Sequence, residues 1–259
     1  KTISKYFKVD TSEVFENLGK DKKQNSRDTS KIKNGGFNMF DNMLDLEKYQ
    51  LVGKQVTNPM ATRSVGGWAM MFLLFSLAGA SRSLFEEKQS GVMLRLLSSP
   101  VTRTQILWSK YLYNMSVGII QLVVLFLGGM LLFKIDVLSN FGNLFLLIIA
   151  SSIACTAFGM FLASFTKTSA QANGLGTLLI LTMSAVGGSW FPVSMMPETI
   201  QFFSKFTITY WSIEGFQAVL WRGSGFIEIL PYLGMLLGIG ILVNIISYFN
   251  FRRGNIFQN

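Results

Sequence analysis

Five long apolar segments dominate the chain after its first 60 residues. They lie at 64–82, 111–133, 141–165, 173–191 and 229–250. A helix needs roughly 20 apolar residues to cross the hydrocarbon core of a bilayer, and every segment fits that range. Inside lipid the backbone must satisfy its own hydrogen bonds, and the segments lack the alternation of a membrane barrel. The sequence therefore predicts an all-α, polytopic helical membrane protein with five transmembrane helices.

The composition agrees with a membrane protein. Half of the residues are hydrophobic and only 14% are charged, whereas a soluble domain carries about 25% charged residues. The net charge of +9 raises the question of nucleic acid. The chain shows no zinc-ligand spacing, no recognition-helix signature and no basic groove interleaved with aromatic residues. We therefore assign the charge to a basic N-terminal segment and to cytoplasmic loops, and expect no nucleic-acid partner.

The residue types needed for catalysis are scarce. The chain has no histidine and a single cysteine, Cys155, in an apolar segment. That excludes an intrachain disulfide, the usual general base and the commonest metal ligand. There is no GxxxxGK[ST] phosphate loop and no nucleophile–base set. We expect a protein that is not an enzyme, with no catalytic residues, no cofactor and no metal site. If ATP drives it, a separate chain hydrolyses the ATP.

The polar, lysine-rich residues 1–60 form a separate segment, followed by a membrane domain over 61–259. A flexible tail and a folded module both fit the polar segment. The chain begins with Lys1 rather than Met, so we expect a piece of a longer protein that lacks an upstream span.

Basic residues suggest an orientation. With the N-terminal segment outside and the C-terminus in the cytoplasm, six basic residues at or near the spans fall outside. Eight fall inside: Arg82, Lys88, Arg95, Arg103, Lys110, Lys167, Arg252 and Arg253. Cytoplasmic loops carry the excess of lysine and arginine, so this orientation is modestly favoured.

The stretch 192–228 is aromatic, too polar to cross a membrane and too apolar for an ordinary loop. We expect amphipathic pieces that dip into the interface. Headgroup-level aromatic residues would be Trp190, Tyr210, Trp211 and Trp221.

The stretch 85–110 connects the first two spans and is rich in charge. Apolar residues there recur at helical spacing, at Phe85, Val92, Met93 and Leu96, which predicts a short helix along the membrane surface. Pro100 would end it. Considered alone, the charge pattern slightly favours a solvated loop that fixes the topology over a helix that contacts a partner.

Two motifs carry a resemblance to a known family. The first combines Glu87, Gly91, the leucine-rich 94–97, Pro-Val-Thr-Arg at 100–103, and Lys110. The second is Gly-Gly-Ser-Trp-Phe-Pro at 187–192 followed by Met-Pro at 196–197. Over roughly residues 45–255 the chain resembles the permease of type 2 ATP-binding cassette (ABC) transporters, a family of bacterial exporters. It departs from the family at Ser109, where glycine is usual, and at 207–211, which lacks a proline.

The resemblance implies a permease subunit of the cytoplasmic (inner) membrane that exports an unidentified substrate. Its partners would be an ABC ATPase subunit, a second permease copy in a homo- or heterodimer, and membrane lipid. Residues 1–60 would end a larger extracellular domain. A cytoplasmic coupling helix would contact the ATPase through Glu86, Glu87, Lys88, Gly91, Arg95, Pro100 and Arg103. An extracellular gate with re-entrant helices would use Phe191, Pro192, Pro197, Glu198 and Glu214.

Two alternatives stay open. A secondary carrier or channel predicts functional charges inside the spans, and the sequence places none deep in a span. A membrane scaffold predicts no ATPase partner. For Glu198 and Glu214, interfacial solvation and helix capping compete with the gate reading. We expect the polar residues of the spans, such as Ser151 and Asn244, to join helices to one another.

Overall fold

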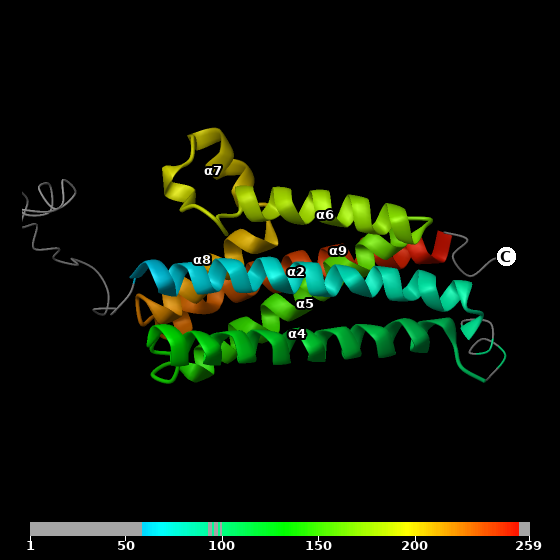
Figure 1. Ribbon diagram of the computed structural model, residues 1–259, viewed down its shortest axis with the longest axis horizontal. Coiled ribbons are helices and arrows are strands. Elements are labelled where there is room, and N and C mark those ends of the chain that lie inside the picture. The colour runs from blue at the N-terminus through cyan, green and yellow to red at the C-terminus, as the bar shows by residue number, and fades with distance from the viewer. Residues whose placement is uncertain (1–58, 93–94, 96–97, 99, 254–259) are drawn as a thin grey trace, which may run out of the picture. The chain divides into compact units, whose positions relative to one another are not determined.

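The computed structural model describes residues 59–92, 95, 98 and 100–253, and the regular secondary structure of this part of the chain is helical (Figure 1). The expected segment 1–60 lies outside the described residues except for its last two. The helices are α2 Pro59–Gln89, α4 Arg103–Phe133, α5 Phe141–Phe165, α6 Ser169–Val186, the 3-10 turn η1 Val193–Met195, α7 Glu198–Ser204, α8 Ile208–Leu220 and α9 Phe226–Arg253.

Four of the described helices are long and apolar enough to cross a membrane. These candidate spans are Ala61–Gly79, Thr104–Phe133, Phe141–Phe165 and Phe226–Phe251. The helical, multi-pass class predicted from the sequence is confirmed, and the helix at 141–165 has the predicted ends. The segment expected at 173–191 is α6, which has 18 residues and is not among the four. Gln171 and Asn173 near its start lower its hydropathy.

The central helix of the bundle is α5, which packs against α2, α4, α8 and α9. Of its apolar window, 72% is buried, against 22% for α4 and 17% for α9. Small residues make this possible, because a Cβ on Gly159 would lie 2.4 Å from the Leu77 carbonyl oxygen of α2. Ala150, Ala154, Ala157 and Ala163 of α5 are also buried, so small residues form a packing face on this helix. Gly234 and Gly238 of α9 form no such face within the described chain, since a Cβ there meets nothing within 4 Å.

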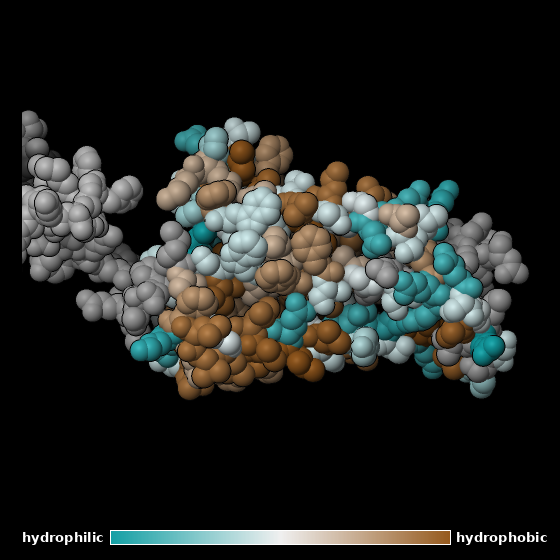
Figure 2. All heavy atoms as spheres, viewed as in Figure 1, coloured by the Kyte–Doolittle hydropathy of each residue, from teal (hydrophilic) through white to brown (hydrophobic). Residues whose placement is uncertain are grey.

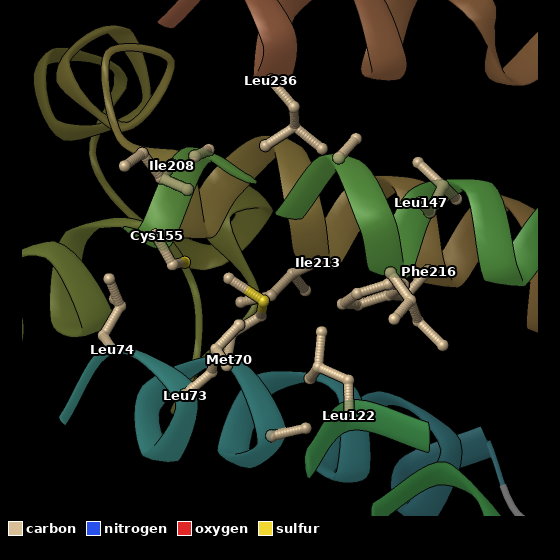
Figure 3. Packing of buried hydrophobic residues seen from close by; sticks show 14 of the residues in the cluster. Met70, Leu73, Leu74, Leu122, Leu147, Cys155, Ile208, Ile213, Phe216 and Leu236 are labelled. Atoms are coloured by element: carbon tan, nitrogen blue, oxygen red, sulfur yellow. The ribbon is translucent and has the colours of Figure 1, made fainter. Parts of the chain in front are cut away.

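The helix α8 packs in the core of the bundle, which the sequence did not predict for any part of 192–228. Ile208, Ile213 and Phe216 on α8 are buried, and Ile213 and Phe216 lie toward Met70 of α2 (Figure 3). The Phe216 ring meets Phe126 of α4 edge-on at 4.9 Å between centroids. The buried apolar residues of α8 therefore place this helix in the core. The short helix α7, in contrast, has exposed phenylalanines.

Charge separates the two ends of the bundle. The chain direction alternates, so α2 ends, α4 begins and α9 ends at one end, hereafter the basic end (Figure 1). In sequence, 82–110, the α5–α6 connection and 252–253 bring eight basic and two acidic residues to this end. The remaining charged residues between 59 and 253 are four basic and four acidic. Hydrophilic residues also gather toward the basic end on the face shown in Figure 2.

Candidate functional site

At the basic end, an ion pair joins the two helices that flank the predicted coupling segment. Lys110 Nζ of α4 lies against Glu87 Oε1 of α2, with side chains 20% and 26% exposed. The Ser83 hydroxyl donates to the same carboxylate oxygen at 3.1 Å. Partial burial and this added hydrogen bond strengthen the pair beyond an ordinary surface contact. The sequence singled out both charged residues, but it did not predict that they pair.

The expected single helix over 85–97 is wrong, because the helix is interrupted at Ser90–Gly91. Phe85, Glu86 and Glu87 form the last turns of α2, and Gly91 has φ +75°, the left-handed conformation in which glycines commonly end helices. Phe85 is buried while Val92, beyond the break, is 42% exposed. They therefore do not share one apolar stripe. Met93 and Leu96, the other stripe residues, lie outside the described residues.

The remaining coupling candidates lie at the end of α2, at the start of α4 or between them. Arg95 is exposed and has helical conformation. Its backbone N–H donates to the Gly91 carbonyl oxygen at 3.3 Å. Pro100 is exposed in a turn, and Arg103 is the first residue of α4. Lys88 belongs to α2; the side chains of Lys88 and Arg103 lie outside the described part.

Thr102 explains why α4 begins where it does. Its hydroxyl accepts from the Gln105 N–H at 3.4 Å, and the Gln105 side chain accepts from the Thr102 N–H at 2.9 Å. This capping box satisfies two backbone donors at the helix start.

At the opposite end, an arginine fastens the 187–192 turn to α2. Arg63 is only 9% exposed, and its Nη2 donates to the Gly188 carbonyl oxygen at 2.7 Å. Gly188 has φ +91°, which favours glycine. Arg63 directly precedes the apolar segment expected at 64–82, whereas α2 begins at Pro59 and includes it. Its only sequence signal was an arginine just before an apolar run.

The predicted gate residues separate into two groups. Phe191 is 65% exposed, and Pro192 and Pro197 are the residues immediately before η1 and α7. Glu198 is exposed in the first turn of α7, where a carboxylate complements the helix dipole. This short segment places these four residues close in sequence and structure.

Glu214 lies on a different element, the core-packed α8. Arg222 Nη2 lies 3.4 Å from its carboxylate and 3.3 Å from the Tyr232 hydroxyl. Burial raises the pKa of the neighbouring Tyr210, with Glu214 and Tyr232 acting in the same direction and Arg222 opposing them. The Tyr210 hydroxyl therefore stays protonated at neutral pH.

Some polar residues inside the bundle join helices, whereas the buried hydroxyls of Ser152 and Thr156 have no hydrogen-bond partner in the described part of the chain. The Ser151 hydroxyl of α5 donates to Ser212 of α8 at 3.0 Å, and Asn244 of α9 donates to the Tyr111 hydroxyl of α4 at 3.1 Å. The expectation that Ser151 and Asn244 connect helices is confirmed. Within the described residues, no group of three or more acidic, cysteine or histidine side chains is placed to hold a metal ion.

Comparison with known proteins identifies the family. A family model described as "ABC-2 family transporter protein" matches residues 17–249. The chain belongs to the ABC-2 transporter family. It is similar to the linearmycin resistance permease protein LnrN of Bacillus subtilis, with 27% identity over 174 residues, 66% of this chain and 44% of that protein. It is equally similar to the inner membrane transport permease YhhJ of Escherichia coli, with 27% identity over 175 residues, 66% of this chain and 46% of that protein. Each match spans less than half of the relative. The resemblance stated from the two motifs is confirmed.

Proposed function

We propose that this chain is the membrane-spanning permease subunit of an ATP-driven exporter in the cytoplasmic membrane. A separate ABC ATPase subunit binds at the basic end, and a second permease copy completes the path. The basic end faces the cytoplasm, and the 187–192 turn faces outward. The observation that carries this proposal is the Glu87–Lys110 pair, which ties α2 to α4 on both sides of the segment predicted to contact the ATPase.

The helix geometry supports a mechanical role for this end. The candidate span in α2 ends at Gly79, but the helix continues to Gln89, so Glu86 and Glu87 extend rigidly beyond it. A displacement of the 90–102 connection is therefore passed to two span-length helices at once. Motion of packed helices as units is a common form of conformational switching.

Charge supports the orientation. The basic end carries eight basic and two acidic residues, whereas the opposite end is balanced. Short cytoplasmic loops collect lysine and arginine.

Export, rather than import, rests on the family resemblance and on the name of one relative, a resistance permease. The substrate stays unassigned. A secondary carrier needs charged residues on a path through the spans. Three charged residues fall within the candidate spans, and all three lie near helix ends. Arg63 bonds Gly188 and Lys110 pairs with Glu87, while Glu228 lies in the first turn of α9. A membrane scaffold without an ATPase is the remaining alternative.

Co-purification tests the proposal. The protein is purified from native membranes in detergent, and bound ATPase is quantified by mass spectrometry. We expect an ATPase subunit with the wild type and much less with Arg95→Glu, because Arg95 is exposed on the coupling segment. Lys205→Glu is the matched control, since Lys205 is exposed at the opposite end. Absence of any ATPase from the wild-type sample favours the carrier or scaffold, and equal loss in both variants overturns the assigned contact surface.

A further inference from the structure

A groove opens on the membrane-facing side of the bundle at its basic end. It lies between α4 and α9, and its volume is about 800 Å³. Its lining includes Trp108, Tyr111, Met160, Asn244, Tyr248 and Phe251. Both α4 and α9 are mostly exposed along their apolar windows, so in a membrane we expect lipid to reach this groove.

Two polar residues that line the groove, Tyr111 and Asn244, are engaged with the protein. The Tyr111 hydroxyl donates to the Ile153 carbonyl oxygen of α5 at 3.0 Å and accepts from Asn244 at 3.1 Å. These bonds hold α4, α5 and α9 together and leave a mainly apolar wall. An apolar wall of this kind suits a hydrocarbon chain, because a hydrocarbon chain can be buried against it without losing any hydrogen bonds.

Aromatic residues and basic positions lie where a headgroup would sit. Trp108 is 59% exposed and Tyr248 is 50% exposed, and such amphipathic rings favour the headgroup level. In sequence, Arg103 precedes the lining residue Thr104, and Arg252 and Arg253 follow the lining residue Phe251. The two acidic residues of this end, Glu86 and Glu87, both belong to α2, and Glu87 pairs with Lys110.

We propose that this groove binds one anionic phospholipid from the leaflet at the basic end. An acyl chain lies against Trp108, Tyr111 and Met160, and the phosphate headgroup lies beside the arginine positions at the start of α4 and the end of α9. The lipid joins α4, which leads from the coupling segment, to α9, which packs on the central helix. The proposal goes beyond the proposed function and does not depend on an ATPase partner.

Tryptophan quenching in nanodiscs tests the proposal. The full protein is placed in phosphatidylcholine discs containing a minor fraction of phosphatidylglycerol with brominated acyl chains. We expect quenching above that produced by the same fraction of brominated phosphatidylcholine. The excess is lost in Trp108→Leu and kept in Trp68→Leu. Trp68 is the matched control, because it is 46% exposed and lines a different groove between α2 and α4.

Charge removal and headgroup exchange complete the test. Replacing Arg252 and Arg253 by glutamine lowers the headgroup preference by about fivefold for each arginine that contacts the phosphate. Equal quenching by both brominated lipids in the wild type overturns the proposal without any variant. An excess that persists in Trp108→Leu also overturns it, since the lipid then binds elsewhere.

Discussion

At Gly67, α2 crosses the 187–192 turn so closely that a Cβ would lie 2.3 Å from the Ser189 carbonyl oxygen. One helical turn earlier on the same helix, Arg63 bonds the Gly188 carbonyl. The two residues fix the turn against α2. Gly67 allows the close approach because it has no side chain, and the charged guanidinium of Arg63 donates a hydrogen bond to the turn.

We predict that Gly67→Ala destabilises the protein by about 1–3 kcal/mol, the usual effect of overpacking. Gly79→Ala, on the same helix, is the control, because a Cβ there meets nothing within 4 Å and alanine favours a helix by up to about 1 kcal/mol. Thermal unfolding in detergent, followed by tryptophan fluorescence, measures both. Equal melting temperatures for the two variants would show that the turn does not press on α2.

Among the elements, α8 is a short helix held in the core, and α7 is a short helix at the surface. Phe216 of α8 is 1% exposed and contacts Phe126, whereas Phe202 of α7 is 59% exposed. We predict that Phe216→Ala costs about 3–5 kcal/mol through lost burial and a cavity. Phe202→Ala changes stability by less than about 0.5 kcal/mol. Chemical denaturation in mixed micelles compares them, and similar losses would place both helices in the same environment.

For the whole molecule, the charge asymmetry predicts a fixed orientation in the membrane. Ser90 is exposed at the basic end, and Met195 is 79% exposed at the opposite end. In intact cells, a membrane-impermeant maleimide is expected to label Met195→Cys and to label Ser90→Cys only after permeabilisation. The native Cys155 is fully buried, so the unmodified protein is the unlabelled control. The reverse pattern would invert the proposed topology.

The spacing of apolar residues and the polar residues between them predicted part of the fold. The helix at 141–165 was predictable to its ends because both of its borders are short polar connections. The break at Gly91 was missed because Phe85 and Val92 keep helical spacing across it, and apolar spacing alone does not report a glycine with positive φ. The burial of α8 was missed because aromatic residues suit an interface and a core equally well.

The sequence by itself determined the membrane class, the positions of the apolar helices, the charge asymmetry and the family. Each of these depends on residues close together in the chain or on totals, which hydropathy and composition report directly. Only the tertiary structure decided the Glu87–Lys110 pair, the Arg63–Gly188 bond and the groove between α4 and α9. The hydrogen bonds in those features join residues that are 23, 125 and 133 positions apart in the chain. Which side chains meet over such separations depends on how the helices rotate and cross when they pack.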